Sequence, residues 1–265
     1  MKQSIARDDI SKAFSDAGIL RGANLLLHSS LSSIGEVRDG PNAVIDGILD
    51  VIGIEGTLMV PTFNYWIMPL FDPATTPGLT GVISEVLRKR RAAVRSLHPT
   101  HSFAALGPLG PRFVLAHEKV GAFQIDSPVD RLAKAGGFTV LLGVRHDSNS
   151  TVHVGEAYAK PWYLGLPFRP NDPTEAKIRD GNIERDVSIA GLQSGCSLAF
   201  NAVEMPLRRN NSILDFKLGN AICQIIPTQA IIDRTVELIR DREDILLCSW
   251  AGCFFCTNAR SLRGI

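Results

Sequence analysis

The segment Phe138-Thr-Val-Leu-Leu-Gly-Val-Arg-His-Asp-Ser-Asn-Ser-Thr-Val-His-Val-Gly-Glu156 carries the signals of a strand, a loop and a helix in direct succession. Its first part, residues 138–143, is almost entirely apolar, which is typical of a short strand buried on both faces of a sheet. Residues 147–150 are all suitable helix N-caps, so a helix is predicted to begin near Thr151. A buried strand, a polar loop and a helix in this order favour an α/β fold.

The predicted helix carries a histidine and a carboxylate on one face. His153 and Glu156 are three residues apart, so their side chains project in the same direction. A carboxylate beside an imidazole can fix its tautomer and make it a stronger base. The pair is therefore a candidate for proton chemistry; the alternative is an ordinary helix N-terminus with an incidental histidine.

Strand and helix patterns alternate along the rest of the chain. Strands are predicted at 24–28, 57–60, 92–95, 182–190, 213–216, 221–226 and 245–248. Helices are predicted at 10–17, 41–52, 80–91, 127–136, 197–208, with a break near Pro206, and 227–240. Residues 162–180 are rich in proline and charge and are predicted to form a long surface loop. With no repeat or linker, the pattern favours one α/β domain, 1–265, with a mostly parallel or mixed sheet flanked by helices.

Composition limits the classes of function. Hydrophobic residues make up 45% of the chain and charged residues 21%, as in a soluble globular protein. The formal net charge is +1, which gives no reason to expect a nucleic-acid or membrane partner. There is no apolar span of roughly 18 residues, and the first ten residues lack the apolar part of a secretory signal. A cytoplasmic location is expected.

Polar loops follow several predicted strands, where open α/β sheets place their ligands. Residues 29–35 are rich in hydroxyls, and His98 and His101 lie in a second such loop. Neither a Gly-x-Ser-x-Gly elbow nor a His-Glu-x-x-His pair is present, so a serine hydrolase or a zincin is not supported. The basic cluster 88–91 is either a solvated helix end or a site facing a phosphorylated ligand.

Three of the five cysteines, Cys248, Cys253 and Cys256, have the spacing C-x4-C-x2-C. A zinc site would need a fourth ligand, which Cys223 or a histidine would have to supply. Reduced, partly buried cysteines are the interpretation adopted, and no metal is predicted.

Five motifs occur in one order: His28-Ser29-Ser30-Leu31; Phe71-Asp72-Pro73 with Thr76-Pro77; Arg95-Ser96-Leu97-His98-Pro99 with Ser102; Ser127-Pro128; and Thr151-Val152-His153 with Glu156. Together they resemble the aminoglycoside 3-N-acetyltransferase family, also called the antibiotic N-acetyltransferase family. The resemblance is strong over residues 5–160 and weakens beyond. It implies the fold of that family, which is not the GNAT fold, with an acyl-CoA-binding part at about 5–160 and an acceptor-shaping, Cys-rich part at about 161–265.

The resemblance also implies a reaction. Acetyl-CoA would be the co-substrate, and its acetyl group would pass directly to an amine of an aminoglycoside or another amino sugar. His153 would be the general base, oriented by Glu156 or, as runner-up, by Glu184 or Asp186. Asp72 and Glu184 are candidates for substrate binding. The candidates for CoA binding are His28, Ser29, Ser30, Leu31, Arg95, Ser96 and Ser102.

Other interpretations of the function remain open at this point. Aminoglycosides are polycations, and a net charge of +1 shows no acidic excess, so a different amino sugar is an equally suitable acceptor. A non-catalytic CoA- or sugar-binding homologue is a rival. A metal-dependent hydrolase using His98, His101 and the tail cysteines is another. Exposed edge strands and the apolar tail make a homodimer an expectation.

Overall fold

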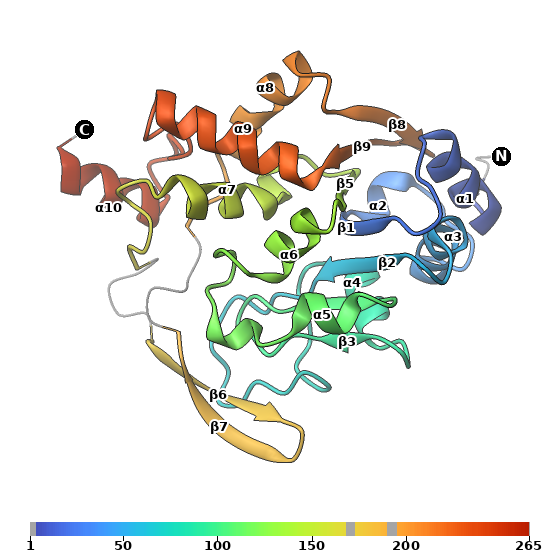
Figure 1. Ribbon diagram of the computed structural model, residues 1–265, viewed down its shortest axis with the longest axis horizontal. Coiled ribbons are helices and arrows are strands. Elements are labelled where there is room, and N and C mark those ends of the chain that lie inside the picture. Colours follow the sequence, from blue (N-terminus) through green and yellow to red (C-terminus); the bar gives the residue numbers. More distant parts are fainter. Residues whose placement is uncertain (1–3, 168–172, 190–194, 265) are drawn as a thin grey trace.

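Seven strands form one sheet through the middle of the computed structural model, which describes residues 4–167, 173–189 and 195–264 (Figure 1). In the order β3-β4-β2-β1-β5-β9-β8, β1 is parallel to β2 and β5, and the other neighbours are antiparallel. The sheet is therefore of the mixed kind, and only the strands around β1 are parallel. The strands are β1 (Asn24–Ser29), β2 (Thr57–Pro61), β3 (Val94–Arg95), β4 (Phe103–Leu106), β5 (Phe138–Leu142), β8 (Leu214–Leu218) and β9 (Ala221–Pro227).

Helices cover both faces of the sheet, so the predicted α/β architecture is confirmed (Figure 1). The helices α1, α3 and α4 pack on one face, and α5, α6 and α9 pack on the other. The α-helices are α1 (Arg7–Asp16), α2 (Leu31–Ile34), α3 (Pro41–Ile52), α4 (Val82–Arg88), α5 (Gly110–Val114), α6 (Pro128–Lys134), α7 (Thr151–Ala159), α8 (Glu204–Arg209), α9 (Thr228–Asp241) and α10 (Phe254–Arg263). Short 3₁₀ turns are η1 (His117–Lys119), η2 (His146–Ser148) and η3 (Phe200–Val203).

The central strands are buried on both sides because their side chains alternate between two apolar layers. In β1, Leu25 and Leu27 pack with α1 and α3, whereas Leu26 faces α6. In β5, Val140 joins the first layer and Leu141 the opposite face. A continuous apolar run satisfies both layers at once, which is why these strands show no polar alternation.

A separate two-stranded hairpin lies at the edge of the molecule. It consists of β6 (Glu175–Asp180) and β7 (Ile183–Ser188), which pair antiparallel. Ala176 and Ile178 of β6 are buried against Phe71, while Lys177 between them is exposed. Figure 1 shows the hairpin extending away from the sheet, with α10 at the end opposite the N-terminus.

Three sequence-based expectations about elements are wrong. The predicted loop 162–180 contains β6, because alternate residues of a charged segment pack on Phe71. Residues 168–172 of that loop lie outside the described residues, and so does Ala190, the last residue of the predicted strand 182–190. β4 forms where only a polar loop was expected, since it closes the sheet between β2 and β3. Residues 245–248 are turns rather than a strand, and α10 follows them. No helix in the described part of the chain is long and apolar enough to cross a bilayer.

α7 rests unusually close to α9 at a glycine. A Cβ on Gly155 would lie 2.4 Å from Cβ of Thr235, which is fully buried and donates its hydroxyl to the Ile231 carbonyl at 2.7 Å. Helix propensity alone would make alanine the better residue at this position. The close approach of the two helices therefore explains the glycine.

We expect Gly155→Ala to lower the free energy of unfolding by about 1–3 kcal/mol, as overpacked core substitutions do. Urea unfolding of the variant and the wild type measures this change. Combining it with Thr235→Ala should recover part of the loss, because the second change removes Cγ2 and Oγ1 of Thr235, at 2.5 and 3.0 Å, and leaves only its Cβ in close contact. A Gly155→Ala protein as stable as the wild type would contradict the close packing.

Candidate active site

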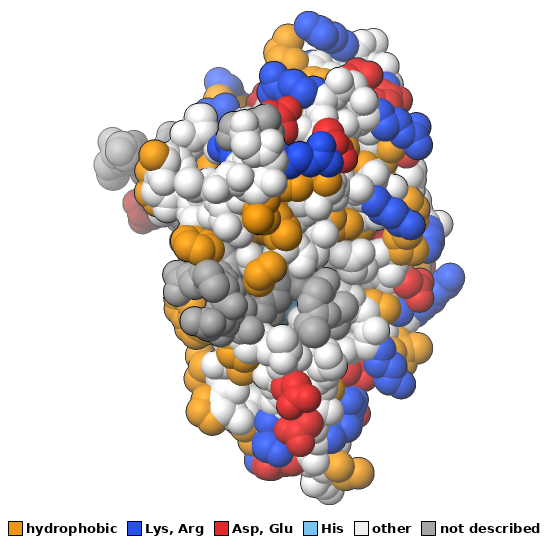
Figure 2. All heavy atoms as spheres, turned by 90° about the vertical axis from the view of Figure 1, so that its left-hand side faces the viewer, with side chains coloured by type: hydrophobic (Ala, Val, Ile, Leu, Met, Phe, Trp, Pro, Cys, Tyr) orange, Lys and Arg blue, Asp and Glu red, His pale blue; other side chains and the backbone are white. Residues whose placement is uncertain are grey.

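A cavity of about 970 Å³ lies at the end of the parallel strands β1 and β5, where the sequence predicted a ligand site. Its walls come from the ends of β1 and β2, from the start of α7, and from residues 195–198 and 250–254. Figure 2 faces the end of the molecule that carries α10, where hydrophobic side chains gather around a hollow. Exposed aromatic side chains at the cavity are Tyr65, Trp66, Trp250 and Phe254.

The predicted histidine–carboxylate pair is formed in the wall of this cavity. Nδ1 of His153 donates to Oε2 of Glu156 at 2.6 Å, and both side chains are buried. The imidazole stacks on Phe123 at 4.9 Å between ring centroids, and the Phe200 ring meets it edge-on at 4.5 Å. Because Nδ1 is engaged by the carboxylate, Nε2 is the ring nitrogen that can take a proton from a bound molecule.

Sequence reasoning missed a third member of this arrangement. The hydroxyl of Tyr163 donates to Oε1 of Glu156 at 3.0 Å, so both carboxylate oxygens are engaged. Tyr163 is almost completely buried, and burial together with the Glu156 charge raises its pKa far above the usual range. It therefore stays a phenol that donates. The aromatic pair Trp162-Tyr163 so soon after α7 was the available signal, and it was assigned to a surface loop.

Two further histidines line the cavity in neutral form. Burial lowers the pKa of His28 to about 3, with the nearby His146 adding to the effect, and burial likewise lowers the pKa of His101 to about 3. Nε2 of His28 shares a hydrogen bond of 3.3 Å with the Ser150 hydroxyl. Of the predicted CoA-binding set, His28 and Ser29 thus reach the cavity.

Arg95 is held by protein groups and does not line the cavity in the described structure. Its Nε donates to the Thr62 and Ser102 hydroxyls at 3.1 and 3.0 Å, and Nη2 donates to the Thr62 carbonyl at 2.8 Å. Nη1 donates to the Pro73 carbonyl at 3.2 Å, and the guanidinium lies over the Phe71 ring. Burial lowers its pKa to about 10. The structure thus places Arg95 and Ser102 in a hydrogen-bonded cluster with Thr62, outside the lining of the cavity; contact of either residue with CoA stays a prediction.

The remaining candidates for CoA binding lie near the cavity or behind it. The Ser96 hydroxyl bonds Nδ1 of His117 at 2.9 Å and is buried. Ser30 precedes α2, with its hydroxyl 3.1 Å from that of Ser32, and Leu31 packs on the core. In the 88–91 cluster, Arg88 pairs with Glu85 and Arg90 pairs with Asp46, so both guanidinium groups already have a carboxylate partner.

The other predicted carboxylates do not meet His153. Asp72 accepts from the Ala74 amide at 2.8 Å and from Arg179 at 2.8 Å; burial opposes the charge, yet these bonds hold the pKa of Asp72 below its usual value. Glu184 pairs with Arg179, and Asp186 pairs with Lys177 on the exposed hairpin. Glu184 and Asp186, the runner-up partners of His153, are therefore in the wrong place. Asp72 joins the hairpin to the turn at 72–76 through Arg179, and Glu184 pairs with the same Arg179 within the hairpin; substrate binding by Asp72 and Glu184 stays a prediction.

Comparison with known proteins decides the family. The family model described as aminoglycoside 3-N-acetyltransferase matches residues 26–240. The chain belongs to the aminoglycoside 3-N-acetyltransferase family. The resemblance inferred from the five motifs is thus confirmed, and the match continues well past residue 160. This membership sets aside the hydrolase reading, and His98 and His101 do not join the cysteines in any metal-ligand group of the described residues.

Individual members of the acetyltransferase family align over most of the chain. Aminoglycoside N(3)-acetyltransferase IV from Salmonella sp is 30% identical over 81% of this chain and 80% of its own length. An aminoglycoside N(3)-acetyltransferase III from Salmonella sp is 28% identical over 84% of this chain and 87% of its own. The structure of a histidine-to-alanine mutant of AAC(3)-IVa in complex with a gentamicin superposes with a TM-score of 0.85 at 27% identity, over 98% of both chains.

Proposed function

We propose that this protein transfers the acetyl group of acetyl-CoA directly to an amine of an aminoglycoside or a related amino sugar. The observation that carries the proposal is the His153–Glu156 pair at a large cavity, in a chain of the aminoglycoside 3-N-acetyltransferase family. A protein that only bound CoA or a sugar would not need a buried imidazole held in one tautomer by a carboxylate.

The proposed chemistry needs a general base and no covalent enzyme intermediate. Nε2 of His153 takes a proton from the acceptor amine, whose nitrogen forms a bond with the thioester carbonyl carbon. The C–S bond then breaks, and the CoA thiolate leaves and takes up the proton that His153 removed from the amine. Glu156 holds the imidazole and stabilises the imidazolium charge, while Tyr163 holds Glu156. The hydroxyls of Ser29 and Ser150 at the cavity wall can face the oxyanion.

The cavity is suited to a sugar that carries positive charge. Exposed aromatic rings such as Tyr65 and Trp250 offer faces for sugar rings and ammonium groups. Asp147 is the only carboxylate among the described residues that line the cavity, and it is exposed to solvent. It is therefore the proposed contact for a second ammonium group of the acceptor.

We expect Asp147→Asn to raise KM for a polycationic acceptor about 3- to 10-fold with little change in kcat, since a binding contact made before and during reaction is lost. Steady-state kinetics with acceptor varied at saturating acetyl-CoA measures this effect, which should shrink at high salt. Asp186→Asn on the hairpin is the matched control and should leave KM unchanged. Equal KM values for wild type and Asp147→Asn would remove Asp147 from the acceptor site.

The proposed function is tested by following thiol release from acetyl-CoA with purified protein. Gentamicin and apramycin are offered beside simple and nucleotide-linked amino sugars. Thiol release that depends on one acceptor class identifies that class. Binding of acetyl-CoA without thiol release for any acceptor would favour the non-catalytic rival. The absence of both acetyl-CoA binding and thiol release would overturn the proposal.

A further inference from the structure

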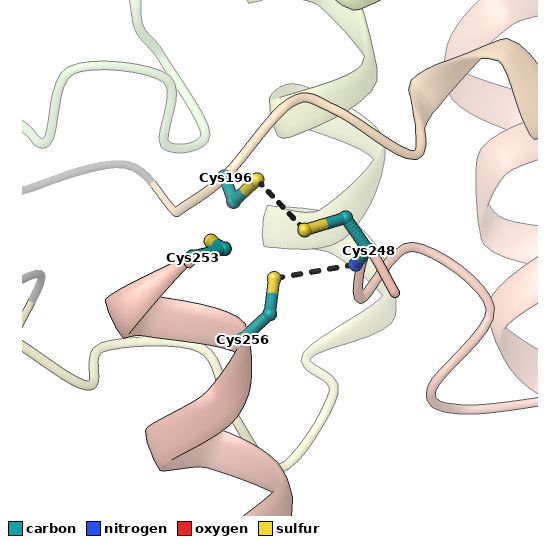
Figure 3. A group of neighbouring side chains, drawn as sticks. All are labelled: Cys196, Cys248, Cys253 and Cys256. Atoms are coloured by element: carbon teal, nitrogen blue, oxygen red, sulfur yellow. Dashed lines mark hydrogen bonds between the residues drawn. The ribbon is translucent and has the colours of Figure 1, made fainter. Parts of the chain in front are cut away.

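Four cysteines from distant parts of the sequence meet behind one wall of the cavity. They are Cys196, which precedes η3; Cys248, in the turn after α9; and Cys253 and Cys256, at the start of α10 (Figure 3). All four are buried, and their Sγ atoms lie within 4.8 Å of one another. The fourth member is Cys196 and not Cys223, which lies in β9 within the main core.

We infer that these four cysteines bind one zinc ion in a structural site. A tetrahedral Zn²⁺ with Zn–S bonds near 2.3 Å holds its sulfur ligands about 3.8 Å apart. The Sγ atoms of Cys196 and Cys248 are 3.7 Å apart, and Figure 3 shows all four side chains converging. An iron–sulfur cluster distributes its cysteines over several iron atoms, so its ligand sulfurs are spread more widely than these. The spacing therefore fits a single ion.

The sulfurs are neither isolated nor bonded to each other. The described cysteines form no disulfide, and 3.7 Å is far longer than the roughly 2.05 Å of a covalent S–S bond. Without an ion, four buried thiols would satisfy each other poorly, because a thiol is a weak donor and a weak acceptor. A divalent cation gives all four sulfurs one strong common partner.

Backbone donors and the start of a helix surround the four sulfurs. The amide of Cys248 donates to Sγ of Cys256 at 3.3 Å, and the amide of Leu198 donates to Sγ of Cys196 at 3.4 Å. Cys253 is the N-cap of α10, so the positive end of that helix faces the group. Arg260 donates to the carbonyls of Cys248 and Leu247 at 2.6 and 2.7 Å. Its positive charge partly offsets the net negative charge of a zinc tetrathiolate.

The site has a structural purpose because it joins three segments that shape the cavity. Residues 195–198 and 250–254 form one cavity wall, and the cysteines lie within them or next to them. Tyr163 packs in the same apolar cluster as the cysteines and reaches Glu156. The ion would thus fix the wall and support the tyrosine that holds the carboxylate. This inference does not depend on the proposed reaction, because its primary readout is metal content.

Elemental analysis of the full chain, purified under reducing conditions without added metal, tests the inference. We expect one zinc ion per chain. Cys196→Ser and Cys248→Ser should each lose most of the zinc, whereas Cys223→Ser, which changes a buried cysteine outside the group, should keep it. Cys196→Ser is the stricter test of the four-cysteine site, because Cys196 lies outside the C-x4-C-x2-C motif.

A second measurement uses the wild type alone and so does not depend on whether a variant folds. Cobalt exchanged into the protein should give a thiolate-to-cobalt charge-transfer band in the near ultraviolet and strong visible bands of tetrahedral cobalt. Wild-type protein that contains no zinc and takes up neither zinc nor cobalt would overturn the site. Iron in place of zinc, a Cys196–Cys248 disulfide found by mass spectrometry, or full zinc content in Cys196→Ser would overturn it as well.

Discussion

Replacing His153 by alanine is expected to lower kcat for acetyl transfer by about 10²- to 10⁴-fold, the range that a positioned general base supplies. An alkylammonium group does not attack a thioester until it loses a proton, and Nε2 of His153 is the proposed acceptor of that proton. The loss should shrink at alkaline pH, where the acceptor ammonium gives up its proton to the solvent without help from the protein. Acetyl-CoA binding, measured by calorimetry, should be retained.

Tyr163→Phe is the matched control for this experiment. It removes the 3.0 Å hydrogen bond to Glu156 and leaves the His153–Glu156 contact in place. We expect a loss of kcat of about tenfold or less that does not depend on pH, since the tyrosine acts only by positioning. A His153→Ala protein with wild-type kcat would exclude the general base. Equal losses in the two variants would mean that the fold of the site, rather than the base, had been damaged.

The sequence was most informative where a local pattern decides the outcome. Continuous apolar runs identified β1, β2 and β5, because strands buried on both faces leave no other composition possible. The pair His153 and Glu156 could be anticipated because a spacing of three on one helix brings the side chains together. The predicted homodimer and single-domain organisation stay predictions.

Contacts between distant segments could not be anticipated in this way. Cys196 lies 52 residues before Cys248, and only the folded chain brings it to the other cysteines. Arg95 was assigned to CoA phosphates because charge alone does not reveal a partner; in the fold, Thr62 and Ser102 occupy its guanidinium. Tyr163 reaches Glu156 for a similar reason, since the turn after α7 folds back on the helix.

The second large effect concerns stability in acid. We expect the free energy of unfolding to fall steeply as the pH is lowered from about 6.5 to about 5. Burial lowers the pKa of His28, His101 and His117 from 6.5 to about 3 and that of His146 to about 4, and it lowers the pKa of His98 well below 6.5. Most histidines of the chain are therefore neutral in the folded state well below neutral pH.

The sign follows from which state binds more protons. Below about pH 6.5 the unfolded chain protonates these imidazoles and the folded chain does not, so acid favours unfolding. Their contribution to stability is complete above that pH and is lost progressively toward the folded-state pKa values. A group whose pKa drops from 6.5 to about 3 loses about 2 kcal/mol of stability at pH 5. The summed contribution of several such groups is comparable to the free energy of unfolding of a typical domain.

The pH window separates the histidines from the carboxylates. Glu85 has its pKa lowered from 4.5 to about 2, so its contribution is lost only below about pH 4.5. Urea unfolding at pH 7.5, 6 and 5 therefore measures the loss of stability above the pH range in which the carboxylates titrate. His117→Asn replaces an imidazole that is hydrogen-bonded to Ser96 and Ala122 by an amide that cannot titrate. This variant should be less stable than the wild type at pH 7.5, but its free energy of unfolding should change less with pH. A stability that does not change between pH 7.5 and 5 would mean that these imidazoles are open to water and protons in the folded protein.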